Sequence, residues 1–172
     1  MKRRTTFFVC ALLLAVVARA QWTPDANKRY LLKHVNSGHY LYLHDNYAET
    51  NAVNATSLRQ VGTAFTVTKN GSNYTFTKAG TSKTLGCANG SWSGWNTSNS
   101  VATAWQFVDA GNGAYYIKSP KGFLGPNQGS NNIGAHIYTD KQQQQYTKWL
   151  VVEENAVPVT PTDGKVYALY ND

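Results

Sequence analysis

The residues best suited to chemistry in this sequence are aromatic side chains that stand beside amides. One group lies in a Gly- and Ser-rich stretch and consists of Trp92, Trp95 and Asn96. A second group lies further along the chain and consists of Asn127, Gln128, His136, Tyr138 and Asp140. An aromatic face binds the apolar side of a sugar ring, while amides and carboxylates bind its hydroxyls. Both groups therefore predict carbohydrate recognition, with peripheral packing and ordinary turn chemistry as the alternatives.

Catalytic chemistry has no comparable support in the sequence. A hydrolase needs paired carboxylates, or a nucleophile with a base, whereas the nine Asp and Glu residues are scattered along the chain. The four histidines lack the spacing of a Cys/His metal site, and we expect His34 and His44 to be solvent-exposed at strand ends. We predict no enzyme, no metal site and no cofactor, although a catalytic domain could follow residue 172 if the chain is a fragment.

The chain begins with a segment typical of a secretory signal peptide. Basic residues at 2–4 precede an apolar run over 7–17, and small residues surround a cleavage site after Ala20. The apolar run is too short to span a membrane, which takes roughly 20 residues. We expect residues 1–20 to be removed and the mature protein, beginning at Gln21, to be secreted or extracytoplasmic. We interpret this cleavage site as bacterial.

The net charge limits which partners the protein can bind, and the cysteine content limits which interactions can stabilise its fold. Without the signal peptide, 12 Lys and Arg stand against 9 Asp and Glu, which leaves a net charge of +3. A charge this small, with no basic stripe, argues against a nucleic-acid partner. Cys87 is the one cysteine after cleavage, so an intrachain disulfide is ruled out and we expect Cys87 to be a buried small residue. The fold must depend on its core.

A pattern of Thr, any residue, aromatic, any residue, apolar occurs three times in the chain. The aromatic positions are Phe65, Trp105 and Trp149. Two further signatures keep step with this pattern, each once per repeat. The first places a tyrosine at Tyr30, Tyr74 and Tyr115, and the second a leucine at Leu41, Leu85 and Leu124. Three signals in one phase predict a threefold internal repeat, with the three aromatics in a shared core.

Within each repeat the apolar residues alternate with polar ones, and turn residues separate the alternating segments, so we expect an all-β fold. Three copies are too few to close a β-propeller, and three repeats of about 42 residues predict a β-trefoil. The expected organisation is a signal peptide over 1–20, a lead-in over 21–27, a β-trefoil over 28–155 (repeats about 28–70, 71–112 and 113–155), a linker over 156–164, and a segment over 165–172 that either begins a further module or is a C-terminal strand.

The aromatic signature, together with the turn Gly38-His39-Tyr40-Leu41, resembles the ricin-type β-trefoil lectins over roughly 28–154. In that family each repeat usually ends in Gln-any-Trp. This chain departs from the signature because a threonine takes the place of the glutamine in every repeat, at Thr63, Thr103 and Thr147. The resemblance implies a lectin-like β-trefoil.

The departure continues at the sugar site that the resemblance implies. The positions of the family's sugar-binding aspartate are occupied here by Tyr42, Gly86 and Gly125. The family's stacking aromatic has a counterpart in Tyr138, with His136 at an adjacent polar position. The familiar galactose site is therefore not carried over whole, and we expect any sugar to bind at a rearranged site.

The sequence as a whole predicts a secreted, non-catalytic carbohydrate-binding module. We expect it to be an accessory domain of a longer extracellular protein, with a glycan or polysaccharide as its partner. The alternative is a β-trefoil that serves protein interaction or structure without binding sugar, because one fold supports many functions.

Overall fold

All but one of the regular elements in the described part of the chain are β-strands. The computed structural model describes residues 21–44, 48–51, 62–86, 104–127 and 130–154. The elements are β1 (Tyr30–His34), β2 (Tyr40–Leu43), β3 (Ala48–Asn51), β4 (Phe65–Asn70), β5 (Asn73–Lys78), β6 (Gln106–Gly111), β7 (Ala114–Ser119), β8 (Gly122–Pro126), β9 (Ile137–Lys141), the 3-10 turn η3 (Gln145–Thr147) and β10 (Lys148–Glu153). The predicted all-β class is confirmed.

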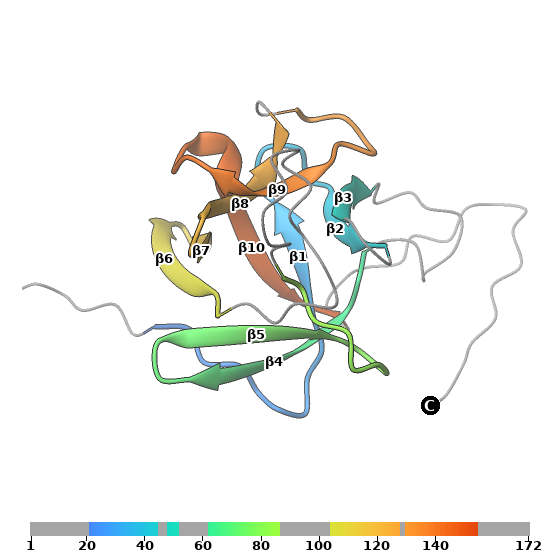
Figure 1. The fold of residues 1–172 in the computed structure, drawn as a ribbon, viewed down its shortest axis with the longest axis vertical. Coiled ribbons are helices and arrows are strands. Elements are labelled where there is room, and N and C mark those ends of the chain that lie inside the picture. Colours follow the sequence, from blue (N-terminus) through green and yellow to red (C-terminus); the bar gives the residue numbers. More distant parts are fainter. Residues whose placement is uncertain (1–20, 45–47, 52–61, 87–103, 128–129, 155–172) are drawn as a thin grey trace, which may run out of the picture.

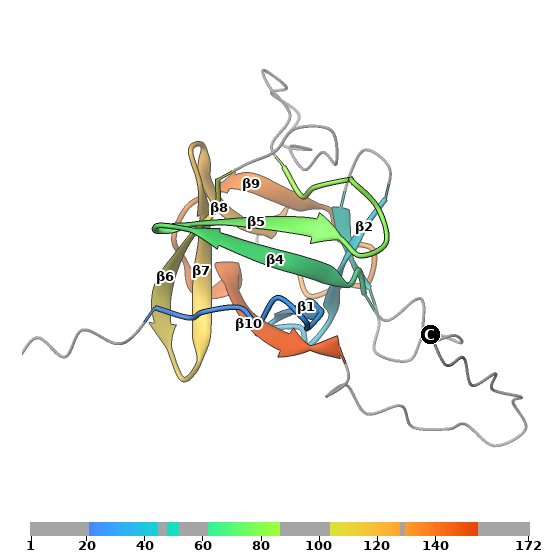
Figure 2. The ribbon, with the colours of Figure 1, turned by 90° about the horizontal axis from the view of Figure 1, so that it is seen from below.

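Six of these strands close into a ring (Figures 1 and 2). β1 pairs with both β4 and β10, β10 pairs with β7, and β7 pairs with β6, while β4 pairs with β5. The last junction joins β5 to the start of β6 through a bridge between Tyr74 and Trp105. Closure matters because it removes the unpaired edges that an open sheet would present.

Two hairpins extend the ring. β2 pairs with β1 and continues into β3, and β8 pairs with β7 and continues into β9. In the second repeat, Thr84 forms a bridge with Thr77 of β5 at the equivalent place, and the chain that follows residue 86 lies outside the described residues. Each repeat thus begins with a ring strand and then leaves the ring.

The three aromatics predicted for the core are fully buried. Each lies opposite the tyrosine that opens its own repeat, on an antiparallel neighbour. The pairs are Tyr30 with Phe65, Tyr74 with Trp105, and Tyr115 with Trp149. One aromatic pair per repeat therefore joins the last strand of that repeat to its first.

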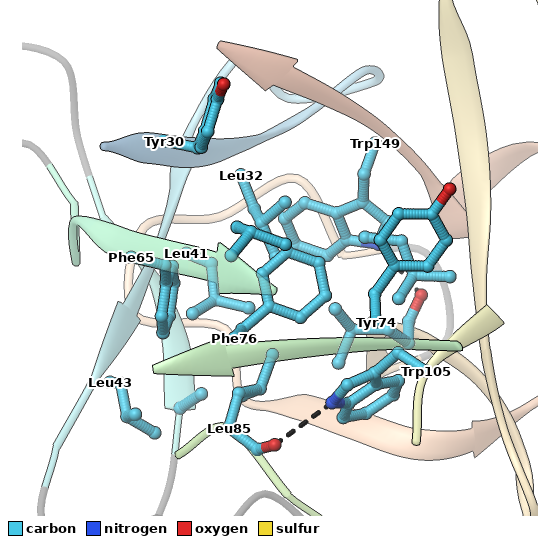
Figure 3. Packing of buried hydrophobic residues seen from close by; sticks show 14 of the residues in the cluster. Tyr30, Leu32, Leu41, Leu43, Phe65, Tyr74, Phe76, Leu85, Trp105 and Trp149 are labelled. Atoms are coloured by element: carbon cyan, nitrogen blue, oxygen red, sulfur yellow. Dashed lines mark hydrogen bonds between the residues drawn. The ribbon is translucent and has the colours of Figure 1, made fainter. Parts of the chain in front are cut away.

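The two core tryptophans also bind the backbone of the signature leucine in their own repeat. The indole Nε1 of Trp105 donates a hydrogen bond of 3.0 Å to the carbonyl oxygen of Leu85 (Figure 3). The indole Nε1 of Trp149 donates one of 2.9 Å to the carbonyl oxygen of Leu124. A buried indole N–H requires such an acceptor, so the leucine of the third signature is held at a fixed place over the core.

In the first repeat a backbone N–H, and not an indole, binds the carbonyl oxygen of the signature leucine. Phe65 has no N–H group, and the carbonyl oxygen of Leu41 instead accepts a hydrogen bond of 2.9 Å from the backbone N–H of Thr63. The hydroxyl of Thr63 in turn accepts one of 2.7 Å from the backbone N–H of Leu43. The threonine that replaces the family's glutamine therefore has a structural role, because it fixes the β2 hairpin to the core.

A tryptophan outside the repeats completes the core. Trp22 lies in the lead-in and stacks on Tyr74 and Phe107, with ring centroids 5.9 Å and 5.5 Å away, while it meets Tyr30 edge-on at 5.0 Å. The hydroxyl of Tyr74 donates a hydrogen bond of 2.5 Å to the carbonyl oxygen of Trp22. The segment before the first repeat is therefore packed against the ring.

The expectation that His34 is solvent-exposed is wrong. Its side chain is fully buried at the end of β1, where it packs against Trp149. Nε2 donates a hydrogen bond of 2.9 Å to the carbonyl oxygen of Tyr146, and Nδ1 lies 2.8 Å from the hydroxyl oxygen of Ser37. Burial lowers the pKa of His34 below the ordinary value of 6.5, and the bond to Tyr146 opposes part of that effect.

This burial predicts how stability depends on pH. The unfolded chain binds a proton at His34 more readily than the folded protein, so the free energy of unfolding should fall as the pH drops below about 6.5 and should be insensitive to this group at higher pH. Urea denaturation at pH 7.5 and pH 5.5 measures the difference. His34→Gln should reduce the difference, whereas the neighbouring His39→Gln should leave it largely intact. An equal pH dependence in His34→Gln and the unmodified protein would contradict this assignment.

Candidate ligand-binding site

An open cleft of about 380 Å³ lies beside the hairpin formed by β8 and β9. It contains three residues of the second group predicted from the sequence, Asn127, His136 and Tyr138. Its full lining is Asn127, Ser130, Gly134, Ala135, His136 and Tyr138. The structure therefore brings an aromatic ring, an amide and an imidazole to one surface in the third repeat.

The pairing of β8 with β9 determines which side chains face the cleft. Ile137 and Thr139 are buried, so the residues that alternate with them, His136 and Tyr138, point to the opposite side. Tyr138 stands opposite Gly125, and the backbone N–H of Asn127 donates a hydrogen bond of 3.2 Å to the carbonyl oxygen of His136. Strand alternation and register thus place the three side chains together.

A lysine holds the tyrosine ring of the cleft. The ammonium group of Lys141 lies 4.0 Å from the centroid of the Tyr138 ring, within the range of a cation–π interaction. The same ammonium lies 3.9 Å from Oδ1 of Asp140. Asp140 belongs to the predicted group, but it is exposed and is absent from the cleft lining. One face of the ring is therefore covered by the lysine.

The remaining residues of the predicted sites fall outside the described part of the chain. Trp92, Trp95, Asn96 and Gln128 are in this position, and their role in binding stays a prediction. The structure adds lining residues that the sequence did not single out, namely Ser130, Gly134 and Ala135. They lie in a loop of small and polar residues, and from the sequence this loop could be predicted only as a turn.

An exposed apolar residue lies next to this lining in the sequence. Ile133 is 61% exposed and directly precedes Gly134 of the lining. The backbone N–H of Ser130 donates a hydrogen bond of 2.9 Å to the carbonyl oxygen of Asn127, which joins two residues of the cleft lining.

Packing explains why the third repeat has no carboxylate at the family's aspartate position. A Cβ atom added to Gly125 would lie 2.7 Å from Cγ2 of Thr147 and 3.4 Å from the carbonyl oxygen of Tyr146. Real Cβ atoms essentially never show the shorter of these separations, so a side chain at Gly125 requires Thr147 to move. An aspartate at position 125 would therefore clash with Thr147.

Two kinds of site are absent from the described ranges. No group of three or more His, Cys, Asp or Glu residues could hold a metal ion there. Within the same ranges, no helix has the length and apolar character needed to cross a membrane.

No protein-family model and no curated protein sequence matches this chain. Solved structures do match. A ricin B-like lectin from Macrolepiota procera, in complex with lactose, gives a TM-score of 0.60 at 15% identity over 76% of this chain and 99% of the lectin. The Rhizoctonia solani agglutinin gives a TM-score of 0.61 at 16% identity over 78% of this chain and 99% of the agglutinin.

The fold is a β-trefoil. This confirms the fold predicted from the three repeats. The same trefoil also matches part of an enzyme, an exo-β-1,3-galactanase from Clostridium thermocellum, with a TM-score of 0.58 at 21% identity over 77% of this chain and 31% of the enzyme. At these identities the shared property is the fold, so the residues of the cleft must carry the argument about ligands.

The close packing at Gly125 can be tested by a double-mutant cycle. Gly125→Ala should lower the free energy of unfolding by about 1–3 kcal/mol, because the new Cβ meets the Cγ2 methyl group of Thr147. Thr147→Ser removes that methyl group and keeps the hydroxyl that donates to the carbonyl oxygen of Gln144. The double variant should therefore lose less stability than the sum of the two single variants.

Urea unfolding of the unmodified protein, the two single variants and the double variant measures this coupling. Strictly additive losses would show that Gly125 and Thr147 do not compete for space. In that case the packing explanation for the missing carboxylate would be wrong.

Proposed function

We propose that this protein is a non-catalytic carbohydrate-binding module and that its glycan binds in the cleft of the third repeat. The observation that carries the proposal is the juxtaposition of Tyr138, His136 and Asn127 around one open cleft. The ricin-type β-trefoil fold supports it, because lectins have this fold. The trefoil fold by itself does not determine a function.

The chemistry of the cleft suits a sugar. The Tyr138 ring supplies an aromatic surface for the apolar side of a pyranose, and the amide of Asn127 and the imidazole of His136 can both donate and accept hydrogen bonds with hydroxyl groups. Such a combination of an apolar wall with a few placed polar groups is typical of small-ligand sites.

We further propose that the module is secreted and serves as an accessory domain of a longer extracellular protein. The signal-peptide pattern over 1–20 supports export. The galactanase from Clostridium thermocellum supports the accessory role, because the trefoil fold there occupies only 31% of an enzyme chain. On this view the module binds a glycan and catalysis, where present, belongs to another domain.

Removal of the aromatic surface should abolish most of the binding. Tyr138→Ala should weaken the binding of any glycan recognised on an array by about tenfold or more, since ring contacts of this kind contribute on the order of 1 kcal/mol beyond the buried area. Tyr138→Phe should retain most of the affinity, because it keeps the ring. Affinity electrophoresis with the recognised glycan gives the ratio of the dissociation constants.

Tyr116→Ala is the matched control. Tyr116 is a half-buried tyrosine on β7 with the ammonium of Lys148 5.7 Å from its ring centroid, and it is absent from the cleft lining. The Tyr116→Ala substitution should leave glycan binding unchanged. A folded protein that binds no glycan on the array, but captures a specific protein without competition from sugar, would overturn the proposed function in favour of a protein-interaction trefoil.

A further inference from the structure

A row of side chains connects the first repeat to the cleft of the third. Tyr42 of β2 stands opposite Glu49 of β3, and Glu49 stands opposite His136, which lines the cleft. Next in the row is Asn127, whose backbone N–H donates to the carbonyl oxygen of His136. Residues directly opposite each other on neighbouring strands project from the same face of a sheet, so these four side chains share one surface that crosses two repeats.

The junction between the two repeats is fixed by Thr50, which is fully buried. Its backbone N–H donates a hydrogen bond of 2.9 Å to the carbonyl oxygen of Ala135, and its carbonyl oxygen accepts one of 2.8 Å from the N–H of Gly134. Its hydroxyl donates a bond of 2.7 Å to the carbonyl oxygen of Asn132 and accepts one of 3.1 Å from the N–H of Ala135. The first repeat therefore holds one wall of the cleft in place.

The carboxylate of Glu49 lies at this wall. Its Oε1 is 3.0 Å from Nε2 of His44, and its side chain is 25% exposed. Its Oε2 lies 4.0 Å from the position that a Cβ atom on Gly134 would occupy, and Gly134 lines the cleft. A carboxylate has about four sites that accept hydrogen bonds, so the contact with His44 orients this group and still leaves it able to accept from a ligand.

The hairpin of the third repeat offers no equivalent acceptor among its described residues. Gly125 occupies the position of the family's aspartate, and a side chain there would meet Thr147. Asp140 lies on the same strand as Tyr138, but its carboxylate is exposed and lies beside the ammonium of Lys141. Glu49 is therefore the carboxylate best placed to serve the cleft, although it comes from another repeat.

We propose that Glu49 is the specificity-determining acceptor of a ligand site shared between the first and third repeats, and that the site takes a neutral glycan whose hydroxyl donates to this carboxylate. The inference rests on the proposed function and deepens it. A neutral sugar presents hydroxyl donors to Glu49, whereas an acidic sugar would bring a second carboxylate against it and be repelled. The site thus differs from one formed within a single repeat.

The test compares Glu49→Gln with the unmodified protein on an array that holds both neutral and uronic-acid glycans. The substitution keeps the size of the side chain and removes its charge, so it should weaken binding to neutral glycans by about tenfold or more, as expected for the loss of a charge-assisted hydrogen bond. The matched control is Glu153→Gln, a charge removal on β10 where Glu153 pairs with Lys28. The control should bind as the unmodified protein does.

Thermal melting establishes that each variant is folded. If Glu49→Gln does not fold, Glu49→Asp provides the same test, because it keeps the charge but draws the carboxylate back from Gly134 and should also lose binding. Unchanged binding in the folded Glu49 variant, with loss in Tyr138→Ala, would overturn the role of Glu49 and leave the proposed function intact. A preference of the unmodified protein for acidic glycans would likewise overturn it. Absence of all glycan binding by the unmodified protein would overturn both proposals.

Discussion

The burial of one aromatic side chain in each repeat is the constraint on which the rest of this structure depends. Phe65, Trp105 and Trp149 each lose all exposure to solvent, and truncation of such a residue typically costs about 3–5 kcal/mol. Burial of an indole also requires an acceptor for its N–H group, and in two repeats that acceptor is the backbone carbonyl of the signature leucine, Leu85 or Leu124. The core therefore both closes the ring and fixes where the third repeat's hairpin, and with it the cleft, must lie.

This arrangement separates the residues that make the scaffold from those that differ between repeats. The tyrosine, leucine and aromatic signatures recur because every repeat uses them in the same core contacts. The cleft uses residues that do not recur, such as Tyr138 and His136, and the carboxylate of Glu49 approaches it from another repeat. The site that we propose thus lies between two repeats, in place of one built within a single repeat.

The fold was predictable from the sequence because its signals are local and repeated. Period-two alternation and the spacing of Phe65, Trp105 and Trp149 predicted strands and a shared core. The prediction for His34 was wrong because β1 pairs on both sides within the closed ring and ends against Trp149, where alternation no longer separates solvent from core. Three of the five residues of the second predicted group meet in the cleft. Glu49 gave no signal, because its approach to His136 depends on the register between strands far apart in sequence.

The most direct test of this account is an NMR titration of the ¹⁵N-labelled protein with the glycan that binds most strongly on an array. The account predicts that the largest changes in amide resonances occur at Glu49, Asn127, Gly134, His136 and Tyr138, which lie on one surface shared by the first and third repeats. Changes gathered instead around Trp22 and Tyr74, or confined to residues 92–96, would place the ligand elsewhere on the trefoil and contradict the account.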